Sequence, residues 1–148
     1  MREQKKGGGD WFNSGLRRRE DGGWWEPAVG GLNMLRYADM GLQDCDFYEI
    51  HEQFAAQRIA TLKAWQSEKF CRDRLGRNGP MGPIDLAKLN SKGGSLAIGH
   101  PFAATGARVV ATMAKLLSEK GSGRGLVSVC TAGGMGVTAI MEAAPNNL

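Results

Sequence analysis

The segment SLAIGHPFAATGAR, residues 95–108, decides the fold prediction because it places a histidine between a glycine and a proline, just before a predicted helix. Pro101 suits the first position of a helix, since its missing N–H would have no partner there. Four small residues follow within residues 103–107, and they predict close approach by other backbone. We therefore expect a buried helix N-terminus with His100 at its mouth, where the helix dipole favours a neutral imidazole and attracts anions.

The predicted helix runs from Pro101 to Glu119 and has an amphipathic second half. Lys115 and Glu119 lie outside its apolar stripe, and Lys120-Gly121 is a typical helix end. The apolar residues at helical spacing are Val109, Val110, Met113, Leu116 and Leu117. This pattern predicts that one side of the helix packs into a core.

The segments before this helix alternate between strand and helix patterns. They predict a short helix over residues 32–40, a short strand over 47–50 and a helix over 54–65. A further helix is expected over residues 67–75, with Ser67 as its N-cap. The inward positions predicted for the helix over 54–65 are Phe54, Ile59, Leu62 and Trp65.

The segments after it predict a hairpin, because two apolar strand patterns, at residues 126–130 and 137–142, flank a glycine-rich turn. Helices that alternate with apolar strands are typical of an α/β layered domain. Residues 1–31 show neither helical nor strand periodicity, and we expect an irregular or disordered segment there. The domain is therefore predicted over residues 32–148.

Composition excludes several classes of protein. The 148 residues are enough for one domain with a core, and the net charge of +4 is modest. Much of the basic excess lies within residues 5–19 without the aromatic and basic pattern of nucleic-acid binding, so no nucleic-acid partner is predicted. No apolar run approaches the ~20 residues of a transmembrane segment.

The three cysteines are widely spaced and odd in number, which argues against a disulfide framework and favours a reducing compartment. We expect the bacterial cytoplasm or the mitochondrial matrix, and not secretion. The chain has no CxxC or HxxxH pair, so no metal site is predicted.

Three turns or strand ends carry a reactive side chain: His51, His100 and Cys130. Each has an ordinary structural explanation when taken alone. Cys130 suits a small core residue, His100 a hydrogen-bonding residue at a helix start, and His51 a surface residue at a strand end. Taken together they are what acyl chemistry through a thiolate requires, because an imidazole can lower a thiol pKa or move its proton. Neighbouring glycines let backbone N–H groups approach an oxyanion.

These residues lie in three motifs that resemble the C-terminal signatures of thiolases: HEQFA at residues 51–55, GGSLAIGHP at 93–101 and CTAGGMG at 130–136. The resemblance is closest to the branch with the β-subunit of the trifunctional enzyme of fatty-acid oxidation, because that branch has histidine where other thiolases have asparagine. It covers residues 32–143. It implies an α/β fold like the C-terminal half of a thiolase, a layered mixed sheet with a buried helix, truncated at its N-terminal side.

The resemblance also implies roles for these residues. His100 would activate the acyl-accepting cysteine and, with His51 and a water, hold the thioester oxygen of the second substrate. Cys130 would be the acid/base that exchanges a proton with the α-carbon of acetyl-CoA. The backbone N–H of Ala132 would contribute to the oxyanion hole.

The implied ligands are acyl-CoA and coenzyme A, in the thiolysis of 3-ketoacyl-CoA during fatty-acid β-oxidation. Coenzyme A acts as a co-substrate, and the resemblance implies no metal or other cofactor. Gly94 and Ser95 would lie on the loop that the family brings near the coenzyme A arm.

Two departures from the thiolase pattern matter. Gln53 replaces the usual alanine and puts a larger polar group near the site. The nucleophilic cysteine of thiolases belongs to their N-terminal half, and neither Cys45 nor Cys71 lies in a matching context. We therefore expect a partial chain without measurable thiolase turnover of its own, whose partner is the missing half or a second copy of the chain.

Two alternatives stay open at this point. One is a non-catalytic thiolase-like partner or interaction module, since a half-thiolase would expose surfaces that associate. The other is an unrelated α/β binding domain whose motifs coincide by chance.

Overall fold

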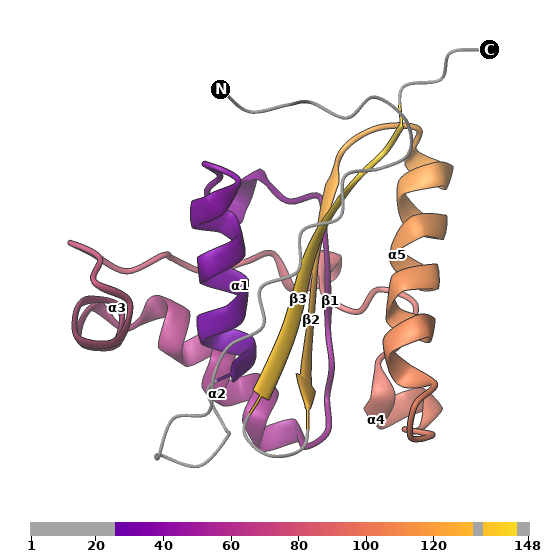
Figure 1. The fold of residues 1–148 in the computed structure, drawn as a ribbon, viewed down its shortest axis with the longest axis horizontal. Coiled ribbons are helices and arrows are strands. Elements are labelled where there is room, and N and C mark those ends of the chain that lie inside the picture. Colours follow the sequence, from indigo (N-terminus) through magenta and orange to yellow (C-terminus); the bar gives the residue numbers. More distant parts are fainter. Residues whose placement is uncertain (1–25, 132–134, 145–148) are drawn as a thin grey trace.

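Residues 26–131 and 135–144 are described by a computed structural model, in which a three-stranded mixed sheet lies between helices (Figure 1). The strands are β1 (Phe47–Ile50), β2 (Arg124–Thr131) and β3 (Met135–Glu142). The helices are α1 (Glu26–Tyr37), α2 (Ala55–Gln66), α3 (Glu68–Leu75), α4 (Ser95–Ile98) and α5 (Thr105–Lys120). Across these two ranges, no helix has the length and apolar character that crossing a bilayer requires.

The sheet has the order β1-β2-β3, with β1 parallel to β2 and β2 antiparallel to β3. The strand predicted over residues 47–50 and the predicted hairpin are confirmed, and the hairpin register pairs Cys130 with Gly136. Because β1 and β2 are parallel, their carboxyl ends meet at one edge of the sheet. That edge carries the candidate site.

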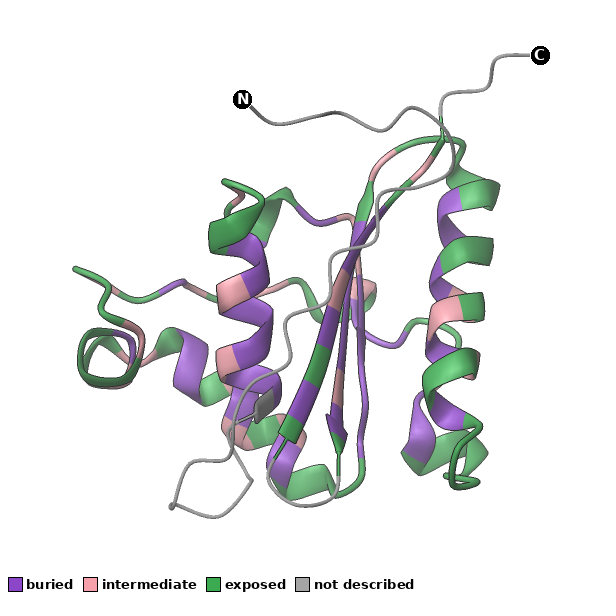
Figure 2. Ribbon diagram, viewed as in Figure 1, coloured by how far each residue is buried: buried purple, intermediate pink, exposed green. Residues whose placement is uncertain are grey.

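Helices cover both faces of the sheet. α1 packs on β2 and β3 from one side, whereas α5 packs on β1 and β2 from the other (Figure 1). The buried residues of both helices lie on the sides that face the sheet (Figure 2). A larger core that includes Trp65 and Leu126 lies on the side of α1 and α2, and a smaller one that includes Met113 and Val127 lies under α5. The predicted apolar stripe of α5 is confirmed at four positions, with Val110 half-buried.

The first helix differs from the prediction, because α1 begins at Glu26, inside the segment expected to be irregular. Its first turn is held by contacts that leave no periodic signal in the sequence. Trp65 Nε1 donates a hydrogen bond to the Ala28 carbonyl at 3.1 Å, and Ser128 Oγ donates one to the Pro27 carbonyl at 3.2 Å. The expectation for residues 1–25 lies outside the described residues.

The inward face predicted for α2 is partly wrong. Phe54 precedes the helix and is exposed, and Ile59 is also exposed. The buried face contains Gln57 and Thr61 together with Trp65. Apolar periodicity misassigned this face because two of its buried residues are polar.

α5 begins at Thr105, four residues later than predicted. Ala103 has a φ of +66°, a left-handed conformation that does not continue a right-handed helix, so residues 101–104 form a turn. The small residues Ala103, Ala104, Gly106 and Ala107 are exposed within the described part of the chain. The predicted burial of this helix start is therefore not seen here.

Candidate active site

The carboxyl end of β1 is held in place by an asparagine side chain. Asn90 Oδ1 accepts a hydrogen bond from Ile50 N at 2.9 Å, and Asn90 Nδ2 donates one to the Ile50 carbonyl at 2.9 Å. His51 N donates to the Ser128 carbonyl at 2.8 Å, which continues the pairing with β2. The backbone of His51 is thus fixed from both sides.

The His51 ring is buried, with 1% of its residue surface exposed. Its Nδ1 lies 2.9 Å from Ser95 Oγ, and its ring centroid lies 4.3 Å from that of His100. The pKa of His51 is lowered to about 4, mainly by burial and also by the nearby His100 and Arg108, while Glu52 opposes them. His51 is therefore a neutral imidazole at pH 7. Its place also corrects the reading of His51 as a surface residue at a strand end.

Glu52 is the second buried polar residue of this strand end. Arg58 Nη1 lies 2.8 Å from Glu52 Oε1, and Leu96 N donates to Oε2 at 3.4 Å. Gly94 lies so close to this carboxylate that a Cβ there would be 2.1 Å from Oε2 and 2.7 Å from Asn90 Nδ2. Only glycine fits at position 94, and this close approach keeps Ser95 next to His51.

His100 lies on an exposed turn that faces the same space. Its Nδ1 lies 2.7 Å from Thr105 Oγ1, and the Phe102 ring packs edge-on at 5.1 Å between centroids. Phe102 itself is 86% exposed. The turn thus orients the imidazole through Thr105 and leaves its ring accessible.

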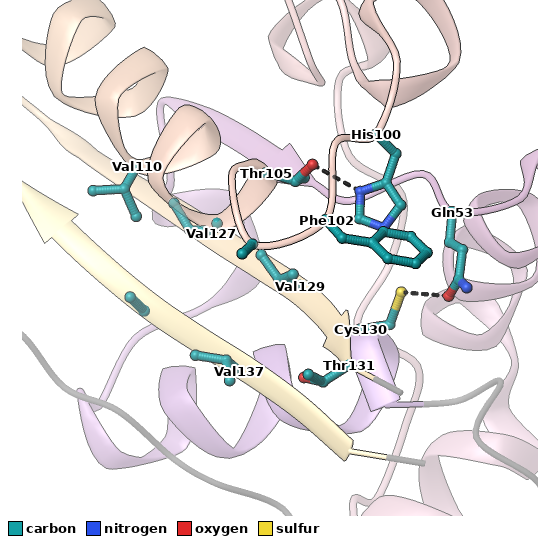
Figure 3. Close-up of a pocket in the computed structure, with 13 residues that line it drawn as sticks. Gln53, His100, Phe102, Thr105, Val110, Val127, Val129, Cys130, Thr131 and Val137 are labelled. Atoms are coloured by element: carbon teal, nitrogen blue, oxygen red, sulfur yellow. Dashed lines mark hydrogen bonds between the residues drawn. The ribbon is translucent and has the colours of Figure 1, made fainter. Parts of the chain in front are cut away.

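His100 and Cys130 line one pocket of about 570 Å³ (Figure 3). The Cys130 thiol donates to Gln57 Oε1 at 3.3 Å and to Gln53 Oε1 at 3.5 Å. Valine and alanine side chains from β2, β3 and α5 form an apolar part of the wall: Val110, Val127, Val129, Val137 and Ala139. The pocket therefore places a thiol and an imidazole beside an apolar surface.

The structure thus brings together three of the predicted site residues: His51, His100 and Cys130. Gln53, predicted to put a polar group near the site, lines the pocket. Gln57 is a further residue that sequence analysis did not single out. Gln53 lies two residues before α2, so helical spacing does not relate the two amides, and no local pattern pointed to Gln57.

Other predicted residues lie elsewhere. Gly94 and Ser95 are buried beside His51, and their contact with a coenzyme A arm stays a prediction. Ala132 lies outside the described residues. Cys45 and Cys71 are buried in the larger core, away from the pocket lining, and burial beside two aspartates raises the pKa of Cys45 to about 12. Within residues 26–131 and 135–144, no three His, Cys, Asp or Glu side chains group to hold a metal ion.

The family is decided by a match to the model of the thiolase C-terminal domain, which covers residues 20–143. This chain belongs to the thiolase family. The thiolase match starts before residue 32, where sequence analysis placed the domain boundary. It includes the three motifs that carry His51, His100 and Cys130.

Named relatives and solved structures agree with this assignment. The chain is 49% identical over 116 residues to a 3-ketoacyl-CoA thiolase of Shewanella sp. strain W3-18-1, which is 78% of this chain and 27% of that protein. A 3-ketoacyl-CoA thiolase of Pectobacterium atrosepticum is 44% identical over 119 residues, which cover 80% of this chain and 27% of that protein. This thiolase chain therefore spans only about a quarter of the length of such relatives.

Among solved structures, the Bacillus anthracis acetyl-CoA acetyltransferase superposes with a TM-score of 0.70 at 29% identity, over 92% of this chain and 29% of that one. The peroxisomal 3-ketoacyl-CoA thiolase of Saccharomyces cerevisiae superposes with a TM-score of 0.69 at 34% identity, over 92% of this chain and 34% of that one. That yeast protein is a five-layered α-β-α-β-α structure of two core domains with identical topology. The thiolase fold predicted from the motifs is confirmed.

Proposed function

We propose that this chain supplies the acid/base part of a thiolase active site, for the cleavage of a 3-ketoacyl-CoA by coenzyme A into acyl-CoA and acetyl-CoA. The observation that carries the proposal is the meeting of His100 and Cys130 in one apolar pocket, with His51 4.3 Å from His100. The names of the relatives support the substrate class. Coenzyme A is a co-substrate in this proposal, and the chain needs no other cofactor.

In the proposed thiolysis, a cysteine thiolate attacks the 3-keto carbon and the bond between C2 and C3 breaks. The electron pair passes to C2 of the leaving acetyl-CoA as an enolate, and the Cys130 thiol returns a proton to that carbon. The thiol of coenzyme A then gives its proton to the Cys130 thiolate and attacks the acyl-enzyme, and the nucleophilic cysteine leaves as a thiolate, so that both cysteines return to their starting states. A neutral His51 next to the His100 ring suits hydrogen bonding to the enolate oxygen, where charge develops.

The acyl-accepting cysteine of this scheme comes from another polypeptide segment. Cys45 and Cys71 are fully buried and do not line the pocket. Loss of the nucleophile typically costs several orders of magnitude in turnover. We therefore expect residues 1–148 alone to cleave acetoacetyl-CoA at no measurable rate.

A chimaera tests the proposal. The 116 aligned residues of this chain replace their counterpart in the Shewanella sp. 3-ketoacyl-CoA thiolase, which keeps its own remaining segment. We expect the chimaera to cleave a 3-ketoacyl-CoA, and Cys130→Ala to lower kcat by about 10²–10⁴-fold. Cys71→Ala is the matched control, because it removes a buried thiol outside the pocket.

Two results would overturn this proposal: a folded chimaera without turnover, or a Cys130→Ala chimaera that is as active as the Cys71→Ala one. The folded state of each protein is checked by its thermal unfolding midpoint. A chain that cleaved acetoacetyl-CoA alone, and lost that activity in Cys130→Ala, would contradict only the need for a second segment.

A second candidate function is a non-catalytic association module, and one observation favours it. Leu96, Ile98 and Phe102 expose 56%, 56% and 86% of their surfaces beside the pocket. Such an apolar cluster is typical of an interface, and the missing thiolase half or a second copy of the chain is the proposed partner. Sedimentation of the purified chain as a monomer at all concentrations would argue against self-association. A cytoplasmic or matrix location stays a prediction.

A further inference from the structure

The starting observation is a chain of three hydrogen-bonded polar side chains, in which Ser95 and His51 are buried and Arg108 is half-buried. Arg108 Nη2 donates a hydrogen bond to Ser95 Oγ at 2.8 Å, and Ser95 Oγ lies 2.9 Å from His51 Nδ1. Ser95 is 6% exposed and His51 is 1% exposed. The other ring nitrogen, His51 Nε2, is buried without a hydrogen-bond partner among residues 26–131 and 135–144.

The donors in this chain can be assigned by counting protons. A guanidinium only donates, so Ser95 Oγ accepts from Arg108. A hydroxyl has one proton and two lone pairs, which leaves one proton and one lone pair for His51. If His51 Nδ1–H donated, Ser95 Oγ would accept twice and its own proton would need another acceptor. The described part of the chain offers none at hydrogen-bond distance.

The alternative arrangement satisfies both Ser95 Oγ and His51 Nδ1. Ser95 donates its hydroxyl proton to His51 Nδ1, and the imidazole then carries its own proton on Nε2. The positive charge of Arg108 polarises the serine hydroxyl and strengthens this donation, because hydrogen bonds in a chain reinforce one another. The same charge disfavours an imidazolium at His51.

We propose that Arg108 and Ser95 are positioning residues that fix the tautomer of His51, so that its buried Nε2 carries the proton in a ring whose centroid lies 4.3 Å from that of His100. This Nε2–H is left to donate to an oxygen that develops negative charge next to the two imidazoles. That the oxygen belongs to a thioester rests on the proposed function, whereas the tautomer does not. Ser95 thus acts through His51, and the coenzyme A contact predicted from the motif stays a separate prediction.

The test uses the whole 148-residue chain, which contains only two histidines. Histidine labelled with ¹⁵N gives four ring nitrogens, and a long-range ¹H–¹⁵N correlation separates protonated from unprotonated ones. His100→Gln assigns the His51 signals. At pH 7 we expect the His51 Nδ1 shift of an unprotonated nitrogen and the Nε2 shift of a protonated one. The opposite pattern, or two averaged shifts, would overturn the proposal.

Variants show whether Ser95 and Arg108 cause this pattern. In Ser95→Ala and Arg108→Met we expect the two His51 nitrogens to move toward a common shift as both tautomers become populated. Ser95→Thr and Arg108→Lys keep the hydroxyl and the charge, and they should restore the pattern of the unsubstituted chain. If Ser95→Ala unfolds, Arg108→Met against Arg108→Lys makes the same comparison. An unchanged tautomer in a folded Ser95→Ala or Arg108→Met protein would overturn the proposal.

The measurement needs no substrate, so it separates this inference from the proposed function. A fixed tautomer in a chain whose chimaera is inactive would support the inference and count against the thiolase activity. In an active chimaera, Ser95→Ala should lower kcat by about 10-fold or more, with Ser95→Thr closer to the unsubstituted protein. Equal turnover in Ser95→Ala and the unsubstituted chimaera would count against the role of the tautomer in catalysis.

Discussion

His51 and His100 lie 4.3 Å apart, yet their surroundings are opposite. The β1 corner, formed by His51, Glu52, Asn90, Gly94 and Ser95, is buried and linked by hydrogen bonds within this chain. The His100 corner, residues 99–104, is exposed, and Phe102 presents 86% of its surface. This contrast shows that the chain by itself completes the surroundings of His51, whereas it leaves the His100 corner open to whatever fills the pocket.

The largest loss of stability is expected when one methyl group is added to the β1 corner at Gly94. A Cβ there would lie 2.1 Å from Glu52 Oε2, so Gly94→Ala must displace a buried carboxylate and the Asn90 amide. We expect a loss of about 3–4 kcal/mol in the free energy of unfolding, because overpacking and broken buried hydrogen bonds add. Urea unfolding of the purified chain measures it.

Gly106→Ala is the matched control, two residues after the His100 corner. A Cβ at Gly106 meets nothing within 4 Å, and the residue lies in the first turn of α5. Alanine should therefore raise stability by about 0.5–1 kcal/mol, the difference in helix propensity. If the two variants changed stability alike, the distinction between a closed and an open corner would be wrong.

The second largest effect concerns pH. Burial shifts the pKa values of Glu49, in β1, and of His51, directly after β1, in opposite directions. Burial raises the pKa of Glu49 to about 7, with Arg108 opposing and Glu52 adding, while the pKa of His51 is lowered to about 4. Between about pH 4.5 and 7 the folded chain keeps a proton on Glu49 that the unfolded chain releases, so this group lowers stability as pH rises. Between about pH 4 and 6.5 the unfolded chain binds a proton at His51 that the folded chain does not, so stability rises with pH.

Glu49→Gln separates these two slopes. In the unsubstituted chain they nearly cancel, and stability should change little from pH 4.5 to 6.5. The variant should gain about 2 kcal/mol over that range, from the His51 slope of about 1.4 kcal/mol per pH unit. It should also exceed the unsubstituted chain by about 2 kcal/mol at pH 8, where Glu49 is ionised. Urea unfolding at several pH values measures both, and a flat profile in Glu49→Gln would contradict the assignment.

A smaller effect is expected at Asn90, whose amide takes the place of a neighbouring strand at the end of β1. Asn90→Ala removes two buried hydrogen bonds of 2.9 Å to Ile50 and should cost about 2 kcal/mol. Gln43→Ala is the control, because the Gln43 amide also bonds two carbonyls, those of Met81 and Pro83, but at partly exposed or exposed positions. It should cost less than about 1 kcal/mol. Equal losses in thermal unfolding would argue against a special role for the β1 corner.

The same contrast explains which features sequence analysis could predict. The strand at residues 47–50, the hairpin and the stripe of α5 follow from apolar periodicity, and they are seen in the structure. The three motifs led to His51, His100 and Cys130, which meet at the sheet edge. Periodicity predicts the strand, the hairpin and the α5 stripe because each of these elements buries one apolar side.

Features that depend on contacts distant in sequence were not predictable from local patterns. Gln57 on α2 reaches Cys130, and the Pro27 and Ala28 carbonyls of α1 accept hydrogen bonds from Ser128 and Trp65. Both depend on which helix face meets the sheet, and polar residues in a buried face hide it. The start of α5 was misplaced for a local reason, because an alanine with a φ of +66° has no sequence signature.

The smallest change in stability should come from a substitution in the His100 corner. Its result decides whether the exposed Phe102 contributes to folding or to association. Phe102 is 86% exposed and packs only edge-on against the His100 ring within the described residues, so Phe102→Ser should change the free energy of unfolding by less than about 0.5 kcal/mol. Its effect should instead appear in association, because a large apolar side chain on an open pocket rim contributes to binding more than to folding. Sedimentation velocity over a range of concentrations measures that effect, with the exposed Tyr37→Ser, remote from the pocket lining, as the control. If Phe102→Ser unfolded the chain as readily as Gly94→Ala, then Phe102 would belong to a packed corner, and both histidines would stand in surroundings that this chain completes alone.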